Sequence, residues 1–213
     1  GYNYTKNPAV THARRLIDNG VIGRVSGFFC RYDVDNEADG NRPWSWRMSR
    51  AQSGTGSNGD VLSHVISVAH FLTNSSISRV VGDYTIVHKE RADSQAAGQT
   101  KIVDNDDMVA ALIHFENGVK GHIGASRVTW GRKCGLRWEL HGTEGTIIYD
   151  QERLNELKLF TRQDNPATDG FRTILTGPLH EPYAAFLPNG GHSLGYMDVK
   201  ICELHDLLSA IEA

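Results

Sequence analysis

Residues 108–130 read MVAALIHFENGVKGHIGASRVTW. The runs Met108–Phe115 and Val119–Trp130 are rich in the apolar, β-branched and aromatic residues typical of strands, and the tripeptide ENG at 116–118 is a turn sequence. Two strands joined by so short a turn pair antiparallel. This stretch predicts a β-hairpin, and with it an antiparallel sheet.

Further strand-like runs lie on both sides of this hairpin and do not alternate with helices. Helical spacing occurs after the capping pair Asn7–Pro8, in residues 59–73, and from Val199 to Ile211. Strands in succession, flanked by helices, indicate an α+β domain. We expect residues 1–213 to form one domain with a large open, mainly antiparallel sheet and helices on one face. The other strand runs are 22–34, 77–90, 136–141, 146–149 and 157–161, and 35–58 is a long loop.

The composition limits the classes of partner. With 213 residues, 39% of them apolar, and a net charge of −3, the chain has no basic excess that would attract nucleic acid or an anionic membrane. It has no apolar run of the roughly 20 residues that span a bilayer and no signal peptide, so we expect a cytoplasmic protein. The uncovered sheet face would expose too much apolar surface for a monomer, and we expect a homo-oligomer, a dimer or tetramer, through that face.

Two further features have structural interpretations. The cysteines Cys30, Cys134 and Cys202 form no Cys-x-x-Cys pair, and we expect reduced packing residues. The segment GTGSNG at 54–59 matches the Gly-x-Gly-x-x-Gly spacing, but it follows a polar loop where a dinucleotide fingerprint requires a strand.

The most informative stretch for function is GDVLSHVISVAHFL at 59–72, which carries Asp60 and His64 four residues apart. On one helix these two side chains would share a polar arc, opposite the apolar face. Phe71 falls on the same arc, which suggests that the arc faces a cleft or another domain. The pair could belong to a solvated helix face, or it could be a general acid/base pair in which a carboxylate raises the proton affinity of an imidazole. A metal site would need a third ligand, for which His192 is a candidate without specific spacing.

An ordered set of motifs resembles a known family. The segments YNYTKNPAV, LIDNGVIGRV, GDVLSHVISVAHFL, DDMVAALIHFENGVKGHIGASR, LHGTEGTIIYD, ERLNELKLF and GGHSLGYMDV follow the order seen in the C-terminal, substrate-binding domain of the Gfo/Idh/MocA oxidoreductases. The WR loop before the helix and the GHxxGY segment resemble its sugar and polyol dehydrogenases. The resemblance implies the dihydrodipicolinate reductase-like fold of that domain, after an N-terminal Rossmann domain that is absent from this chain.

The resemblance also implies an activity and a cofactor. Members bind NAD or NADP mainly through the Rossmann domain, and their catalytic lysine lies there in a Glu-Lys-Pro segment that does not occur here. We expect the intact protein to oxidise a hydroxyl of a sugar, anhydrosugar or inositol-like polyol by hydride transfer, and this chain alone to be inactive. The alternative is a non-catalytic sugar-binding or dimerisation module of the same fold. A metal-dependent hydrolase is a third possibility that nothing in the sequence favours.

Site residues follow from the matched motifs. His64 falls on the family's proton acceptor and Asp60 on the aspartate that assists it, whereas Leu62 and Ser67 depart from the small residue and aspartate of many members. The resemblance places Asn3 near the nicotinamide; its structural alternative is a side chain that binds backbone. Arg127, Arg132 and Lys133 are more typical of solvated charges than of a pocket. The expected substrate-binding residues are Trp46, Arg47, His192 and Tyr196.

Overall fold

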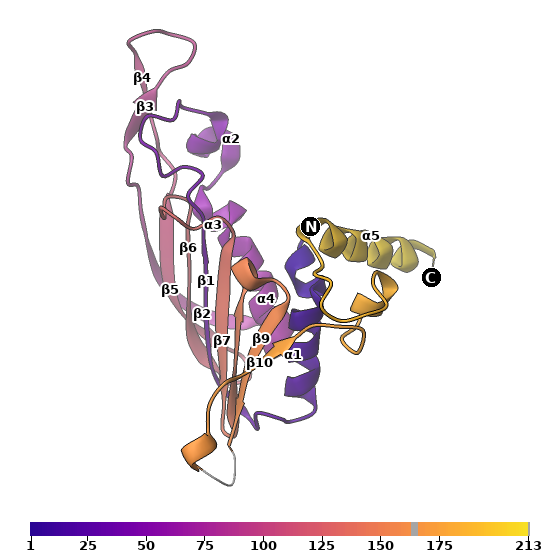
Figure 1. The fold of residues 1–213 in the computed structure, drawn as a ribbon. Coiled ribbons are helices and arrows are strands. Elements are labelled where there is room, and N and C mark those ends of the chain that lie inside the picture. The colour runs from indigo at the N-terminus through magenta and orange to yellow at the C-terminus, as the bar shows by residue number, and fades with distance from the viewer. Residues whose placement is uncertain (163–165, 213) are drawn as a thin grey trace.

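The computed structural model describes residues 1–162 and 166–212 as a large sheet with helices against one face (Figure 1). Eight strands form the sheet in the order β10-β9-β8-β7-β1-β6-β5-β2. The β1–β6 pair is parallel and the other neighbours are antiparallel, as expected for a mainly antiparallel α+β fold. The strands are β1 Val25–Asp33, β2 Ile77–Thr85, β5 Met108–Phe115, β6 Lys120–Ser126, β7 Gly135–Gly142, β8 Gly145–Asp150, β9 Glu156–Thr161 and β10 Arg172–Leu175.

Alternation along β1 shows how the sequence assigns the two faces. Phe28, Cys30 and Tyr32 are buried toward the helices, whereas Phe29 and Arg31 point to the opposite face and are partly exposed. On that opposite face, register aligns Val81, Leu112, His122 and Phe29 across neighbouring strands. Val81 is 74% exposed and Leu112 63%, so this face leaves apolar side chains uncovered.

Helices α1 (Pro8–Asp18) and α4 (Leu62–Thr73) cover the core face of the sheet (Figure 1). The Asn7 side chain caps α1 by accepting a hydrogen bond from the Ala9 N–H at 2.7 Å. Both helices bury their apolar stripes in one cluster with the strands. The last helix, α5 (Tyr196–Glu212), packs instead on the 3₁₀ turn η1 (Asn3–Lys6). Further 3₁₀ turns are η3 Gln151–Arg153, η4 Pro166–Thr168 and η5 Tyr183–Ala185.

The structure corrects several expected boundaries. The helix expected over 59–73 is two helices, α3 (Ser57–Asp60) and α4, separated at Val61. The strand expected over 77–90 ends at Thr85, and a separate two-stranded sheet, β3 (Glu90–Ala92) with β4 (Thr100–Ile102), follows it. Strand β10 was not expected. The loop at 35–58 contains short helices, η2 (Trp46–Met48) and α2 (Arg50–Ser53).

The cysteines and the helices bear on two further expectations. Cys30, Cys134 and Cys202 are free thiols; Cys30 and Cys202 are buried, and Cys134 is only partly so. None of the helices in residues 1–162 and 166–212 combines the length and the apolar character needed to cross a bilayer.

Candidate active site

His64 lies in the first turn of α4, surrounded by the edges of aromatic rings. Its ring centroid is 5.4 Å from that of Tyr2, 5.0 Å from Tyr4 and 6.0 Å from Tyr32, with all three rings steeply inclined to it. Its Nδ1 is buried and has no hydrogen-bond partner among the described residues. Burial lowers the pKa of His64 below its usual value, and the charge of Asp60 opposes that shift in part. The imidazole is thus held in its neutral, proton-accepting form near neutral pH.

Asp60 acts on this imidazole from a different helix. It is the exposed last residue of α3, and the turn at Val61 separates it from α4. The hydrogen bonds of the described residues include none between the Asp60 and His64 side chains; the Asp60 C=O accepts one from Ser63 Oγ at 3.3 Å. The sequence spacing therefore produces a charge interaction, without the helical i,i+4 contact that we expected.

A hydroxyl network beneath His64 was not anticipated from the sequence. The Tyr4 and Tyr32 hydroxyls lie 2.6 Å apart, and Cys134 Sγ is 3.7 Å from the first and 3.4 Å from the second. Burial raises the pKa of both tyrosines; the bond to Tyr32 raises that of Tyr4 further, whereas for Tyr32 the contact with Cys134 raises the pKa and the bond to Tyr4 lowers it. The net shift is upward for both, so both stay protonated. The only signal in the sequence is the alternating Tyr2 and Tyr4, because Tyr32 and Cys134 are distant along the chain.

Tyr196 and Asn3 lie close to this cluster. The Tyr196 ring, at the start of α5 and 43% exposed, has its centroid 6.1 Å from that of Tyr4. Asn3, in η1, is fully buried, and neither its Nδ2 nor its Oδ1 has a hydrogen-bond partner among the described residues. The backbone-binding alternative for Asn3 is therefore not what its amide does in this structure. A buried amide without partners is costly and needs an explanation.

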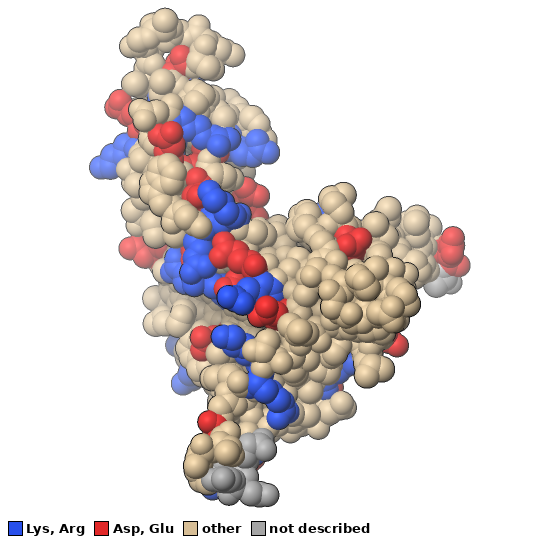
Figure 2. Space-filling model, in the orientation of Figure 1, with Lys and Arg blue, Asp and Glu red and all other residues tan. Residues whose placement is uncertain are grey.

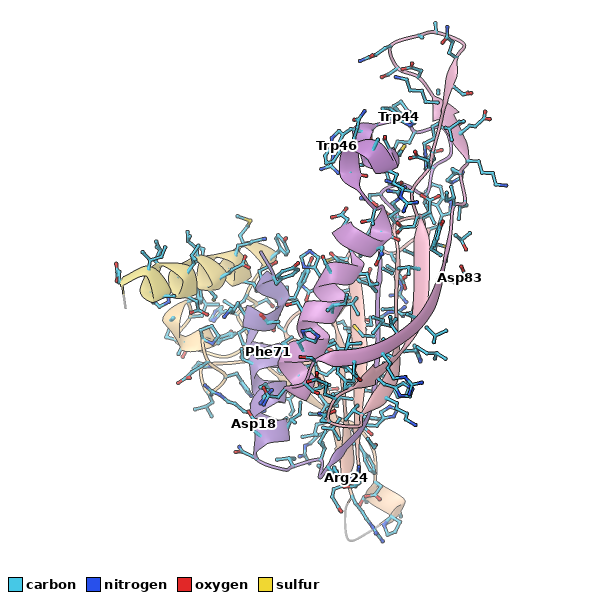
Figure 3. All side chains as sticks on the ribbon, turned by 180° about the vertical axis from the view of Figure 1, so that it is seen from behind. Asp18, Arg24, Trp44, Trp46, Phe71 and Asp83 are labelled. Carbon is cyan, nitrogen blue, oxygen red and sulfur yellow. The ribbon has the colours of Figure 1, made fainter. Side chains whose placement is uncertain are left out.

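Trp46 and Arg47 form a separate exposed pair. The Arg47 guanidinium lies over the Trp46 ring at 4.5 Å from its centroid, a cation–π contact. The Asn105 side chain donates to the Arg47 C=O at 2.7 Å, which fixes the backbone while both side chains stay exposed. Figure 3 shows Trp46 beside α2, at the opposite end of the α3–α4 segment from Phe71.

The elements that carry the His64 cluster and the Trp46–Arg47 pair lie on opposite sides of a re-entrant angle of the molecule. Figure 1 shows η1 and the start of α5 on one side of it and α2 and α3 on the other, and Figure 2 shows the hollow between these two parts of the surface. Phe71 does not border that hollow: it lines a cavity of about 450 Å³ together with Pro182, Ile201 and Cys202. Phe71 therefore does not share a cavity with Asp60 and His64, and the expectation that the whole arc faces one cleft stays untested.

His192 lies in the exposed loop before α5. Its Nδ1 is 3.4 Å from the Asn189 C=O, and its own C=O accepts a hydrogen bond from the Tyr183 hydroxyl. No contact joins it to His64 among the described residues. Within residues 1–162 and 166–212, no three His, Cys, Asp or Glu side chains lie close enough together to hold a metal ion.

The GTGSNG segment binds a side chain of the same protein, the Asp106 carboxylate. The Gly56 N–H donates to Asp106 Oδ1 at 2.9 Å, the Asn58 N–H donates to Oδ2 at 2.6 Å, and Ser57 Oγ donates to Oδ2 at 3.0 Å. The backbone donors that would hold a phosphate are thus occupied by a carboxylate. This segment follows α2 and runs into the four-residue α3, so it lacks the strand of a dinucleotide fingerprint.

The basic residues at 127–133 are ion-paired. Arg127 differs from the solvated charge that we expected, because it is 5% exposed and donates from Nε to Asp107 at 2.8 Å. Arg132 and Lys133 pair at the surface with Glu152 and Asp35, each at 2.6 Å. Arg127 is therefore a structural residue of the loop that carries Arg47, whose C=O it also contacts at 3.2 Å.

Comparison with known proteins identifies the family to which this fold belongs. Residues 10–148 match the family described as GFO/IDH/MocA C-terminal domain. The levoglucosan dehydrogenase of Pseudarthrobacter phenanthrenivorans is 37% identical over 99% of this chain and 56% of its own length. A levoglucosan dehydrogenase structure in complex with NADH and levoglucosan has a TM-score of 0.92, with 37% identity over 99% of this chain and 56% of that one.

A second solved structure, an NAD binding oxidoreductase from Klebsiella pneumoniae, is 39% identical with a TM-score of 0.91, and covers 97% of this chain and 55% of its own. The chain spans about half the length of these relatives. These relatives cover 97% or more of this chain, whereas the family model covers residues 10–148. The chain belongs to the Gfo/Idh/MocA oxidoreductase family, and it corresponds to the C-terminal domain of that family's proteins.

Proposed function

We propose that the full-length protein is an NAD(P)-dependent dehydrogenase that oxidises a hydroxyl of a sugar, anhydrosugar or polyol. The observation that carries this proposal is His64: a half-buried imidazole with a lowered pKa and a carboxylate nearby. Such a group is suited to remove the hydroxyl proton as hydride leaves the same carbon. This chain alone, without a cofactor domain, is expected to be inactive.

In the proposed reaction, the substrate C–H bond and O–H bond break together and a carbonyl forms. His64 takes the proton, and Asp60 stabilises the imidazolium that results. The surrounding tyrosine rings exclude water from one side of the imidazole. The nicotinamide cofactor, when bound, accepts the hydride and its two electrons.

Asn3 is the residue of this chain that we propose for cofactor contact. Its buried amide has an unused donor and an unused acceptor, which fits a carboxamide such as that of nicotinamide. Because the side chain is fully buried here, such contact requires η1 to adjust when the cofactor domain is in place. The relative solved with NADH supports the class of cofactor, and the choice between NAD and NADP rests on residues outside this chain.

We propose that the substrate lies in the hollow between α2–α3 and η1–α5. Arg47 carries several N–H donors suited to neighbouring hydroxyls, and Trp46 and Tyr196 offer exposed aromatic surfaces. His192 remains a proposed substrate contact from the opposite side. The relatives solved with levoglucosan and with L-sorbose support a sugar as the substrate class.

We also propose a homo-oligomer, a dimer or tetramer, formed through the open sheet face. The uncovered row on that face, which includes Val81, Leu112 and Phe29, is the surface that such a contact would bury.

The test uses the full-length protein with a panel of sugars and polyols, including levoglucosan and L-sorbose, and each cofactor. His64→Ala is expected to reduce kcat roughly 100-fold or more, because proton transfer to a positioned base contributes that much. His70→Ala is the matched control, since His70 is an exposed histidine on the same helix. Equal activity of both variants would remove the proposed role of His64. Cofactor binding without turnover across the panel would favour the non-catalytic module.

A further inference from the structure

Strand β2 is the outermost strand on one side of the sheet, and among the described residues it pairs only with β5. It is nine residues long, and most of it is exposed: Val80 by 62%, Val81 by 74% and Tyr84 by 59%. It contains no proline, and its ladder is regular from Arg79 to Thr85. A long edge strand of this kind presents unpaired backbone groups that can template another strand.

Two hydrogen bonds show which residues direct their backbone to the open edge. The Thr85 C=O accepts from the Asp107 N–H at 2.9 Å, on the β5 side. The Tyr84 N–H donates a hydrogen bond to Oδ1 of the preceding residue, Asp83, at 2.8 Å, and so does not bond to β5. Because alternate residues of an antiparallel strand direct their backbone groups to opposite sides, Val80, Gly82 and Tyr84, within the regular part of the ladder, face the open edge.

The side chains of β2 are divided between the two faces of the sheet. Val81 lies opposite Leu112 on the face away from the helices, whereas Val80 lies opposite the buried Ile113. Arg79 and Asp83, two residues on either side of Val81, therefore share its face. Both are exposed.

We propose that β2 pairs antiparallel with β2 of a second copy of this chain, about a two-fold axis through Val81. Each Arg79 then lies directly opposite Asp83 of the other copy, and the two form a pair of cross-strand ion pairs. In this pairing the Asp83 carboxylate leaves the N–H of its neighbour Tyr84 and binds Arg79 of the other copy. The charges on the open edge of β2 are thus complementary to those on the same edge of a second copy.

The charges select this register over its neighbours. A two-fold axis through Arg79 or Asp83 would place like charges opposite each other, which destabilises a strand pair. An axis through Val80 would place Arg79 opposite Val81 of the other copy, and an axis through Gly82 would place Asp83 there. In both cases the charged side chain has no oppositely charged residue across from it. Among these registers, only the axis at Val81 joins opposite charges.

The helix side of the sheet accommodates the same pairing. There Val80 of each copy lies opposite Gly82 of the other, which has no side chain to compete for space. A cavity of about 660 Å³ between α4 and β2, lined by Ile66, His70, Val80 and Tyr84 among others, borders this edge. Pairing leaves the opposite sheet face free, so an edge contact and the proposed face contact can coexist in a tetramer.

Charge reversal tests the register in the full-length protein, with the molar mass from sedimentation velocity as the readout. Arg79→Asp creates two like-charge pairs per contact and is expected to halve the mass of the assembly. The double variant Arg79→Asp/Asp83→Arg restores opposite charges and is expected to restore the mass. A monomeric wild type, an unaffected single variant, or a double variant that stays dissociated would each overturn the proposal. This readout is independent of dehydrogenase activity.

Cysteine trapping tests the axis directly. Opposed residues of a non-hydrogen-bonded pair have Cα atoms about 4.5 Å apart, within the range that a disulfide spans, whereas diagonal neighbours lie about 7–8 Å apart. Val81→Cys is expected to form a covalent dimer under mild oxidation. Val80→Cys, the matched control, is expected to stay monomeric on a denaturing gel, like the wild type. Crosslinking of Val80→Cys without Val81→Cys would overturn the axis.

Discussion

Asp60 raises the pKa of His64 across the break between two helices, by charge and without a side-chain hydrogen bond among the described residues. Burial lowers the same pKa and is the larger effect. The pKa of the proposed base thus depends mainly on two opposed influences, burial and the Asp60 charge, and a substitution of Asp60 removes the second.

Asp60→Asn removes the larger of the two charges that raise the His64 pKa. We expect the acid limb of the pH profile of kcat/KM to move to lower pH, because neutral His64 persists further into acid. The plateau should fall, by about tenfold if the pKa falls by about one unit, since the imidazolium loses its stabilising charge. Asp18→Asn, an exposed aspartate paired with Arg14 on α1, is the control. A limb that moves to higher pH would contradict the charge interaction.

Tyr4→Phe removes a buried hydroxyl from the network beneath His64. The Tyr32 hydroxyl loses its 2.6 Å partner, so we expect a loss of about 1–2 kcal/mol in the free energy of unfolding, measured with urea. Tyr2→Phe, on a ring that is 49% exposed, should change it by less than about 0.5 kcal/mol. Equal effects of the two variants would mean that the network contributes nothing.

Arg127→Met leaves Asp107 buried without its ion-pair partner; the Asp107 side chain is 1% exposed. We expect a loss of about 3–5 kcal/mol in unfolding free energy, the usual cost of breaking one side of a buried pair. Arg132→Met breaks a surface pair with Glu152 and should cost under about 1 kcal/mol. Thermal unfolding of both variants measures the difference in their stability losses. A larger loss for Arg132→Met than for Arg127→Met would contradict the structural role of the buried pair.

Arg47→Ala tests the proposed substrate contact. We expect KM for the sugar to rise roughly tenfold or more, as for loss of a hydrogen bond to a charged group, with a smaller change in kcat. Arg50→Ala, an arginine in the neighbouring α2 that lines the cavity beside β2, should leave KM unchanged. Steady-state kinetics of the two variants decide whether the Trp46–Arg47 pair faces substrate.

The sequence predicted the elements whose signal is local. The turn at 116–118 joins β5 and β6, Asn7 caps α1, and the apolar spacing after Val199 marks α5. The break at Val61 was missed because the apolar periodicity runs through it, while Gly56–Asn58 are held by Asp106, almost 50 residues away. Strand β10 has only four residues, too few for an alternation signal.

The candidate site divides in the same way. Asp60 and His64 were found from their spacing within an apolar run, whereas the aromatic neighbours of His64 are Tyr2, Tyr4 and Tyr32, and Tyr196 in turn contacts Tyr4. Such a cluster exists only after the sheet, η1 and α5 have come together, and no local pattern encodes it. Arg127 was misjudged because burial depends on Asp107 and Asn105, which lie on a different strand connection.

The position of β1 also constrains the order in which the chain can fold. Residues 25–33 lie between β6 on one side and β7 on the other, so this early strand has no sheet neighbours until residues 120–142 have been made. Closing a loop of about 90 residues is slow compared with forming the β5–β6 hairpin. Tyr32, on β1, therefore reaches His64 only when the centre of the sheet closes, and the proposed base acquires its surroundings late in folding.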